Sequence, residues 1–308
     1  MSETLDMQRG LLLSLSPGRR TYWMAQAVAV LSLVVLLSAV PFAKVQLAQL
    51  PSFVPIYESA LILNDLITAA LLFGQFAITR SRAMLALASG YLFTAATALG
   101  HLLSFPGLFA PGGLLGAGPQ STAWIYMFWH AGFPLSVIAY AVLKGREERQ
   151  PDRFPAYTLT RQSALGTVAA VLGASAACVA LATAGEHLLP PIMAANRYTP
   201  TMAIVAGSTW CICVAALVVL WRTPPHLTLD VWLMVVLCVW ICDVALSTVF
   251  NGGRYDFGFY AGRVFGLLGA SFVLLSLLIE NTVLHSRLAA ARAELKQLAA
   301  GNVGDRQG

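Results

Sequence analysis

The 308-residue chain contains about eight apolar runs, each close to the roughly 20 residues that a helix needs to cross a lipid bilayer. The runs cover residues 22–43, 56–79, 83–104, 122–143, 163–185, 199–221, 229–250 and 258–284. Hydrophobic residues make up 58% of the chain and charged residues 11%, against about 45–50% and 25% in soluble proteins. The sequence therefore predicts an all-α, polytopic transmembrane bundle of about eight helices.

Basic residues are concentrated in the segments on the same side of this bundle as the N-terminus. They are Arg9, Arg19, Arg20, Arg80, Arg82, Lys144, Arg146, Arg149, Arg153, Arg161, Arg222, Arg287, Arg292, Lys296 and Arg306. The opposite connections hold little beyond Lys44, Arg197 and Arg254. Because cytoplasmic loops carry the excess of Lys and Arg, we expect both termini in the cytoplasm, with residues 1–21 as a cytoplasmic segment and not a cleavable signal. These flanks account for the formal charge of +5, so we expect no nucleic-acid partner.

The last apolar run continues into a short heptad pattern. Its apolar positions alternate steps of four and three residues, the spacing of a coiled-coil seam, and they are Leu284, Leu288, Ala291, Leu295 and Leu298. Charged residues lie off the seam. We expect a sensor domain over residues 22–284 and a cytoplasmic coiled-coil stem with an unfolded tail over residues 285–308. The stem would join two copies as a homodimer.

Ionisable and polar residues interrupt the apolar runs, although each charged group costs roughly 2.5–3.5 kcal/mol in the hydrocarbon layer. In the second run Glu58, Asp65, Thr68 and Gln75 are seven, three and seven residues apart, which places them on one helix face. We infer an aromatic and polar pocket in the outer half of the bundle. The candidate ligand-binding residues are Glu58, Asn64, Asp65, His101, Trp129, His130, Asp243 and Arg263.

Several of these residues have alternative interpretations. Asp243 and Arg263 lie on adjacent helices and could simply neutralise each other, and Glu58 could be a helix N-terminal residue near the interface. His101 and His130 could bind a metal or haem together with Asp65 or Glu58, but no close His-x-x-His spacing supports this. We therefore expect hydrogen-bonded histidines and no metal or cofactor. The five cysteines all fall within predicted helices and indicate no disulfide framework.

Two other segments carry structural predictions. The uncharged loop from Phe105 to Pro119 is rich in Gly, Pro and apolar residues, so it should lie at the lipid interface or fold back over the bundle, either as passive packing or as a lid. The fifth run is rich in small residues, as is the segment from Gly262 to Gly266, and both predict close helix packing. The small residues of the fifth run are Gly166, Ala170, Gly173, Ala174 and Ala177.

The segment from Phe53 to Lys144 resembles the fourth type of bacterial membrane-associated sensor domain. The resemblance rests on the stretch that begins Phe53-Val-Pro-Ile-Tyr-Glu, on Ser89-Gly-Tyr-Leu-Phe-Thr, on the Phe105 loop and on Trp129-His-Ala-Gly-Phe-Pro. It implies a multi-helix input module of the bacterial inner membrane, placed ahead of a diguanylate cyclase or histidine kinase output. Neither a Gly-Gly-Asp-Glu-Phe stretch nor a kinase domain follows the heptads, so we expect a shortened receptor or a sensor that acts through a partner.

The leading functional hypothesis is a sensory input module that detects an unknown small ligand or ion and moves its last helix. The alternative is a small proton-coupled or ion-coupled transporter in which Asp65 and Asp243 bind the coupling ion. Pro134 interrupts one helix, but no matched break occurs in the other half, as such transporters often have. An enzyme is not expected, because no nucleophile motif, metal-ligand spacing or phosphate loop appears.

Overall fold

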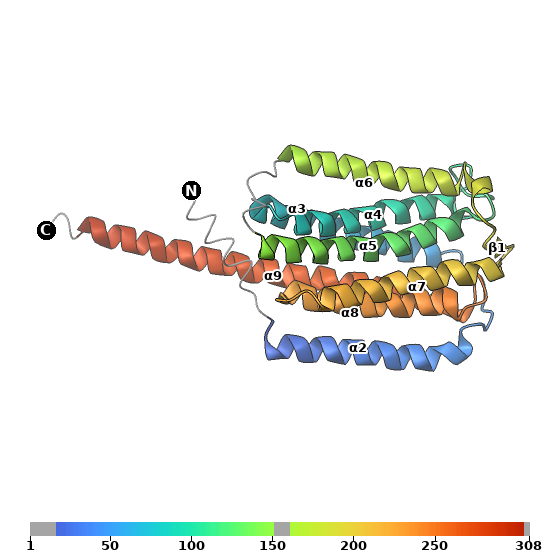
Figure 1. Ribbon diagram of the computed structural model, residues 1–308, viewed down its shortest axis with the longest axis horizontal. Helices are drawn as coiled ribbons and strands as arrows, with labels where there is room; N and C mark the ends of the chain where they lie inside the picture. Colours follow the sequence, from blue (N-terminus) through green and yellow to red (C-terminus); the bar gives the residue numbers. More distant parts are fainter. Residues whose placement is uncertain (1–16, 151–160, 305–308) are drawn as a thin grey trace.

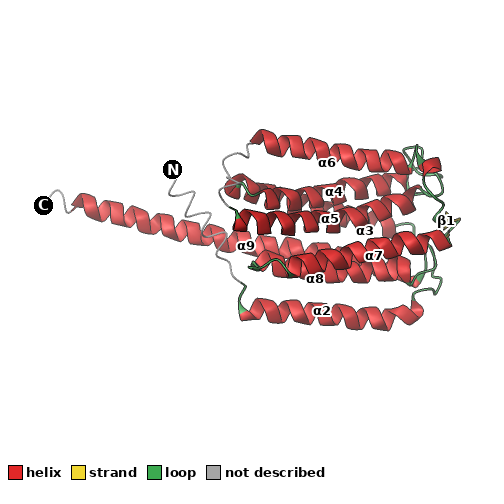
Figure 2. Ribbon diagram, in the orientation of Figure 1, coloured by secondary structure: helices red, strands yellow, loops and turns green. Residues whose placement is uncertain are grey.

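The computed structural model describes residues 17–150 and 161–304 of the chain and is almost entirely helical over them (Figures 1 and 2). The long helices are α2 (Arg19–Ala39), α3 (Phe53–Thr79), α4 (Arg82–Ser104), α5 (Ser121–Arg149), α6 (Arg161–Ala182), α7 (Pro200–Trp221), α8 (Thr228–Val244) and α9 (Phe257–Gly304). Eight segments of the described chain are long and apolar enough to cross a membrane. The all-α, polytopic prediction is confirmed.

Successive helices run in opposite directions, so the connections lie at two ends of the bundle (Figure 1). One end carries the two-stranded pairing of β1 (Met193–Ala194) with β2 (Arg197–Tyr198), and we call it the hairpin end. At the other end α9 projects beyond the remaining helices, and we call it the stem end. Basic residues gather at the stem end, as the sequence predicts for the cytoplasmic side.

Helices α2 and α6 lie at opposite edges of the bundle (Figure 1), and α8 is the most buried of the membrane spans. In the most apolar stretch of each helix, 78% of the residues of α8 are buried, against 22% in α2 and 6% in α6. The exposed faces of α2 and α6 are apolar, which suits contact with lipid chains. The bundle core therefore consists mainly of α3, α4, α5, α7, α8 and the first half of α9.

The small residues of the fifth span do not pack in the way that the sequence analysis expected. Gly166 and Gly173 of α6 have no neighbouring atom within 4 Å of an added Cβ, and the alanines near them are exposed. Helix α6 instead approaches the bundle at Gly100 of α4, where an added Cβ would lie 2.5 Å from Val179 Cγ2. A small side chain permits a close contact, but it does not determine which face turns inward.

In contrast, the small residues of α9 do form a close contact, against α8. An added Cβ at Gly262 would collide with Ser247 Oγ, and one at Gly266 would lie 2.7 Å from Asp243 Oδ2. At Gly269 the nearest atom would be Val239 Cγ1 at 3.1 Å. The predicted tight packing at the start of the last helix is thus present, and it brings the α9 backbone against a buried carboxylate.

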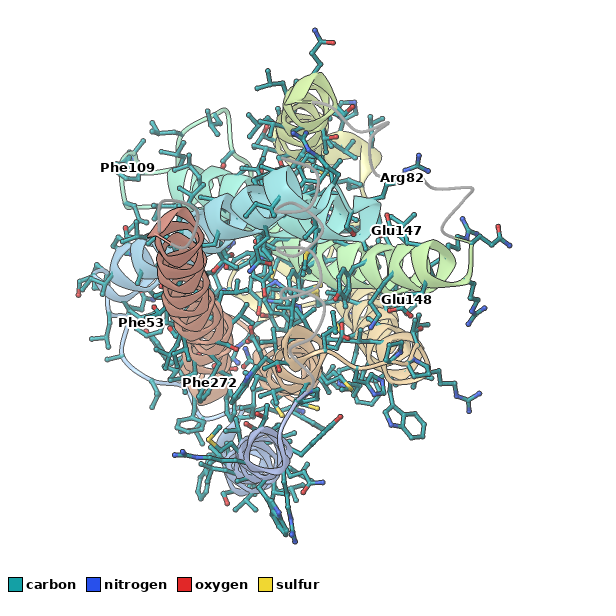
Figure 3. All side chains as sticks on the ribbon, turned by 90° about the vertical axis from the view of Figure 1, so that its left-hand side faces the viewer. Phe53, Arg82, Phe109, Glu147, Glu148 and Phe272 are labelled. Atoms are coloured by element: carbon teal, nitrogen blue, oxygen red, sulfur yellow. The ribbon has the colours of Figure 1, made fainter. Side chains whose placement is uncertain are left out.

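Buried ionic contacts hold the stem end together. Asp230 of α8 pairs with Lys144 Nζ of α5 at 2.5 Å and accepts a hydrogen bond from Tyr140 at 2.7 Å. On the other side of α5, Glu147 accepts a hydrogen bond from the backbone N–H of Arg82, beside which Figure 3 shows it. These contacts fix α5 against α4 and α8 where charged groups approach the membrane surface.

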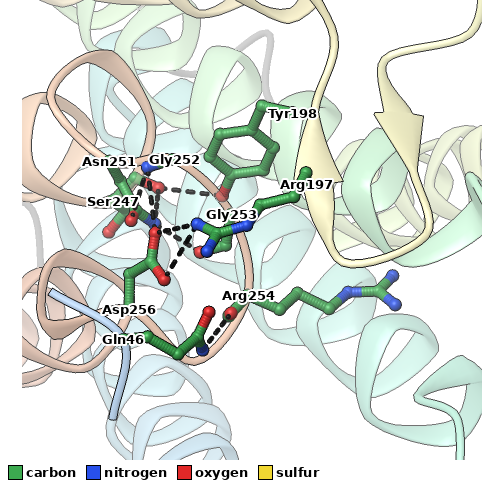
Figure 4. A network of polar contacts seen from close by, with 9 residues as sticks. All are labelled: Gln46, Arg197, Tyr198, Ser247, Asn251, Gly252, Gly253, Arg254 and Asp256. Carbon is green, nitrogen blue, oxygen red and sulfur yellow. Dashed lines mark hydrogen bonds and ion pairs between the residues drawn. The ribbon is translucent and has the colours of Figure 1, made fainter. Parts of the chain in front are cut away.

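A polar network closes the hairpin end (Figure 4). Asp256, just before α9, accepts hydrogen bonds from Arg197 of β2 and from the backbone N–H of Gly252. Tyr198 donates a hydrogen bond of 2.9 Å to the carbonyl oxygen of Ser247. The β1–β2 hairpin is therefore attached directly to the end of α8 and the start of α9.

Helix α9 continues well past its apolar part. Its membrane-spanning section ends at Ile279, and the helix runs on to Gly304, so the projecting stem extends about 38 Å at 1.5 Å per residue. It includes residues 299–304, which the sequence analysis expected to lie in an unfolded tail. The side-chain packing of Leu284, Leu288, Leu295 and Leu298 lies outside the described residues.

The glycine contact between α8 and α9 can be tested by adding one methyl group. Gly262→Ala should lower stability by roughly 1–3 kcal/mol, because the methyl group would force Ser247 away from Asp243. Gly74→Ala is the matched control, since an added Cβ at this helical position has no neighbour within 4 Å. Thermal unfolding in detergent should show a lower midpoint for the first variant only, and equal midpoints would contradict the packing.

Candidate functional site

A buried histidine and aspartate join α5 to α8 in the middle of the core. His130 Nε2 lies 3.2 Å from Asp243 Oδ2, and the two side chains are almost completely inaccessible. The other carboxylate oxygen accepts hydrogen bonds from Tyr126 at 3.1 Å and from Ser247 at 2.7 Å. Both oxygens of Asp243 therefore have partners, as a buried carboxylate in lipid requires.

The local structure of α5 explains how His130 is held. Pro134 has no backbone N–H, so the carbonyl oxygen of His130 lacks its usual helical donor. Trp240 of α8 donates its indole N–H to this carbonyl at 3.2 Å. The proline thus leaves the His130 carbonyl free to accept a hydrogen bond from Trp240. Trp240 and Asp243, three residues apart on α8, therefore both contact His130.

The hydrogen bonds of His130 constrain its protonation. Nδ1 lies 2.9 Å from the carbonyl oxygen of Tyr126, which can only accept, so Nδ1 carries a hydrogen. Nε2 then either donates to the Asp243 carboxylate as part of an imidazolium or accepts from a protonated Asp243. In both cases one proton lies between the two groups, and the pair carries no net charge. Such a pair is tolerable in the bilayer and can be disturbed by a nearby charge.

The backbone changes its geometry just beyond Asp243. Residues Ala245–Val249 form a π-helical turn, in which the N–H of Phe250 donates to the carbonyl of Ala245. Such turns often occur at functional sites. Here the turn follows the residue that contacts His130 and contains Ser247, whose hydroxyl binds Asp243 and whose carbonyl binds Tyr198. It links the buried pair to the hairpin end.

A second histidine and carboxylate lie between α3 and α4. Glu58 Oε1 is 2.6 Å from His101 Nδ1, and both side chains are inside the protein. The contact is an ion pair by distance, but its angle does not satisfy hydrogen-bond geometry, so both groups keep unused hydrogen-bonding capacity. Glu58 is therefore part of the interior, not the interfacial residue of the alternative interpretation.

Arg263 of α9 is buried but has no acidic partner within 4.0 Å among the described residues. Its guanidinium carbon lies 3.7 Å from the ring centre of Phe259 and 4.9 Å from that of Tyr126. One N–H donates to the Phe259 carbonyl, and Nε has no partner. The structural pair of Asp243 with Arg263 is not present, because Asp243 binds His130 instead.

Asp65 lies on the polar face of α3, where it accepts a hydrogen bond of 2.7 Å from Thr94 of α4. Elsewhere in the described interior, several polar side-chain atoms have no hydrogen-bond partner. They are Tyr57 Oη, both carboxylate oxygens of Glu58, Thr68 Oγ1, Tyr91 Oη, His101 Nδ1, Ser104 Oγ, Trp129 Nε1 and Arg263 Nε. Buried polar groups normally have partners. We call these side chains, which belong to α3, α4, α5 and α9, the polar chamber, and their unused hydrogen-bonding groups can bind water or a ligand.

His101 and Arg263 of the polar chamber also line a small cavity at the hairpin end. The lining residues are His101, Phe105, Thr122, Ala123, Tyr126, Met193, Tyr198, Met202, Arg254, Phe259 and Arg263. Its free volume is about 20 Å³, the space of one water molecule. Burial raises the pKa of Tyr198, so its hydroxyl stays protonated and can donate. We call this space the hairpin-end cavity.

The Phe105–Pro119 loop turns back onto the end of α4, and its apolar residues Phe109, Leu114 and Leu115 stay exposed, which suits the expected position at the lipid interface. The N–H of Leu114 donates to the carbonyl of Leu103, and Phe105 is buried in the wall of the hairpin-end cavity. At Gly113, φ is +85° and an added Cβ would collide with the carbonyl oxygen of Ser104, so glycine is required there. The loop therefore borders the cavity.

The predicted site residues do not all meet. The chamber, the hairpin-end cavity and the contacts of Asp65 and Asp243 described above include Glu58, Asp65, His101, Trp129, His130, Asp243 and Arg263. Asn64 instead points toward α9, where its side-chain amide donates to Ser271 at 2.9 Å. The sequence analysis missed Tyr57, which lies within electrostatic reach of Glu58, Asp65, Asp243 and Arg263. It also missed the role of Arg254, which it counted only as a loop charge.

The histidines, cysteines and carboxylates of the chain are the side chains that could ligate a metal ion. Within residues 17–150 and 161–304, no three side chains of the His, Cys, Asp and Glu types come together as a metal site. The five cysteines are free and lie in α6, α7 and α8. The arrangement has the chemistry of a buried proton-sharing and hydrogen-bonding site.

The membrane-spanning fold agrees with comparison to known families. The family MASE4, described as a membrane-associated sensor and integral membrane domain, matches residues 48–284. The chain belongs to this family, which confirms the predicted resemblance, and it is a multi-pass membrane sensor domain. Helix α2 precedes the matched range. No protein of curated function matches the chain.

The His130–Asp243 contact can be measured by a double-mutant cycle. His130→Gln and Asp243→Asn should show a coupling energy of roughly 1–3 kcal/mol, because each removes the partner of the other. A control cycle of His130→Gln with Asp65→Asn should be additive within about 0.5 kcal/mol, since Asp65 binds Thr94. Reversible unfolding in detergent or bicelles provides the measurement, and additivity in both cycles would contradict the pair.

Proposed function

We propose that this sensor domain detects a small ligand or ion in the polar chamber and transmits the signal through α9. The observation that carries the proposal is the position of Asp243. It binds His130 on one side, and on the other it lies against Gly266 of α9, with no side chain between. A change in charge or hydrogen bonding at His130 would reach the stem helix through one carboxylate.

The stem helix lies at the end of this path without a break. Its first half carries Arg263 and the glycines that contact α8, and its second half projects beyond the bundle (Figure 1). A ligand can shift such an equilibrium only if it binds two states of the bundle with different affinity. The cavity of about 20 Å³ represents the closed state, and a liganded state would be wider. The Phe105–Pro119 loop is the proposed lid.

Sensing is favoured over the alternative of an ion-coupled transporter because the matched family consists of sensor domains. The basic residues at the stem end support an orientation with both termini in the cytoplasm of a bacterial inner membrane. Residues 1–21 would be a cytoplasmic segment, residues 22–284 the sensor and residues 285–308 the stem and tail. The output would be a diguanylate cyclase or histidine kinase, and no catalytic role is proposed for the chain itself.

The proposed path can be tested in the full-length protein by hydrogen exchange of residues 280–304. Asp243→Asn should change the exchange rate of this segment by roughly tenfold, equivalent to about 1.4 kcal/mol, a common allosteric coupling. Lys44→Gln is the control, because it removes an exposed cation at the hairpin end that forms no ion pair with the described residues. If both variants exchange like the wild-type protein, the path through Asp243 is wrong.

The heptad seam predicts a homodimer that depends on the stem. Leu288→Asp combined with Leu295→Asp should abolish dimers, because it introduces charges into the apolar seam. Arg292→Ala combined with Lys296→Ala changes the net charge by the same two units off the seam and should leave dimers intact. Chemical crosslinking in membranes checks both variants. Unchanged crosslinking of the seam variant would exclude dimerisation through the stem.

A further inference from the structure

The hairpin-end cavity has an excess of positive charge. Arg254 and Arg263 both line it, and no carboxylate oxygen of the described chain lies within 4.0 Å of either guanidinium group. Each of the nearby carboxylates has a cationic or histidine neighbour other than these two arginines. They are Glu58, which pairs with His101, Asp243, which pairs with His130, and Asp256, which pairs with Arg197.

Both arginines keep hydrogen-bond donors unused. Arg263 is 5% exposed and its Nε has no partner, although one N–H donates to Phe259. Arg254 donates to the hydroxyl of Thr122 at 2.5 Å and lies over the ring of Phe105. A guanidinium group presents five N–H donors in a planar fork. The guanidinium groups of Arg254 and Arg263 both line the hairpin-end cavity and both have N–H donors without a partner, which suits the binding of an anion.

The two positive groups also disfavour each other in the empty site. Burial lowers the pKa of Arg254, and the positive charge of Arg263 lowers it further. Both groups nevertheless stay charged, because the pKa of a guanidinium lies far above neutrality. An anion between them would remove this repulsion and supply the missing hydrogen-bond acceptors.

The remaining wall determines what kind of anion fits. Phe105, Met193, Met202 and Phe259 form an apolar part of it, beside the polar groups of His101, Thr122, Tyr126 and Tyr198, and the two methionines have flexible side chains that adapt to a ligand. A highly charged anion such as phosphate would leave some of its oxygens against the apolar part. A carboxylate on a short apolar chain would place two oxygens on the guanidinium forks and its chain on the methionines.

We propose that the hairpin-end cavity is a binding site for a small organic carboxylate, held between Arg254 and Arg263. The proposal rests on the sensor function and names the chemical class of its ligand. Because the cavity has space for about one water molecule, binding requires Phe105 and its loop to move outward. Tyr126 connects the site to the signal path, since its ring stacks on His130 at 3.7 Å and contacts Arg263.

The test is a thermal-unfolding titration of the full-length protein with sodium propionate replacing sodium chloride at constant ionic strength. Propionate should raise the unfolding midpoint in a saturable manner, by about 5 °C or more at a hundredfold excess over Kd. Sodium phosphate forms a second arm and should give a smaller rise. Stabilisation by phosphate alone, or no rise with either anion, would overturn the proposal.

Variants locate the binding. Arg263→Gln, which keeps a donor for Phe259, and Arg254→Gln should each weaken propionate binding by roughly tenfold or more. Lys44→Gln, which removes an exposed cation from the same end but outside the cavity, should bind like the wild-type protein. If Arg263→Gln does not fold, Arg254→Lys serves instead: it keeps the charge, loses the fork and should weaken binding. Equal weakening by Lys44→Gln would reduce the effect to surface charge and refute the site.

Hydrogen exchange of residues 280–304 separates this proposal from the sensor function. Propionate that binds through the two arginines without changing stem exchange would retain the site and refute the signal path. If Asp243→Asn changes the exchange of the stem but propionate does not bind, the signal path through Asp243 is retained and the carboxylate-binding site is refuted. Each result thus decides one of the two proposals independently.

Discussion

The hydrogen bond between His130 and Asp243 is the interaction on which the interior depends. Asp243 cannot exist as an isolated charge in the hydrocarbon layer, so it must be neutralised by a partner on another helix. That requirement joins α5 to α8 at a fixed height, and the same carboxylate lies against the glycine face of α9. The requirement that the Asp243 carboxylate be neutralised therefore helps to position three helices, α5, α8 and α9.

Pro134 and the π-helical turn make this arrangement possible. The proline exposes a carbonyl oxygen that Trp240 satisfies, and the turn after Val244 directs Ser247 toward both Asp243 and Tyr198. At each irregular position a backbone carbonyl oxygen accepts a hydrogen bond from another element. His130 accepts from Trp240 of α8, and Ser247 accepts from Tyr198 of β2. The irregular backbone is the means by which the core reaches the hairpin end.

Helix number, direction and approximate boundaries could be predicted from the sequence, because apolar length and the distribution of Lys and Arg act locally along the chain. Most of the chamber residues could also be predicted, since an ionisable group in an apolar run needs a partner or a functional role. The sequence did not predict which residue would be the partner of each group. A pair of Asp243 with Arg263 was one of two interpretations, since α8 and α9 are consecutive, but the partner of Asp243 lies on α5, because helix neighbours are determined by packing across the whole bundle. Asn64 is adjacent to Asp65 in the sequence, so its side chain points about 100° away around the helix, where it donates a hydrogen bond to Ser271.

The continuity of α9 has a consequence for how the domain can be combined with others. A helix without a joint has a defined phase, so anything attached to residue 304 faces a direction set by Gly262 and Gly266. Adding one residue to the stem would turn the attached domain by about 100°, whereas adding seven would return it to nearly the same azimuth about 10.5 Å further away. The number of residues in the stem therefore determines the orientation of an attached domain relative to the bundle.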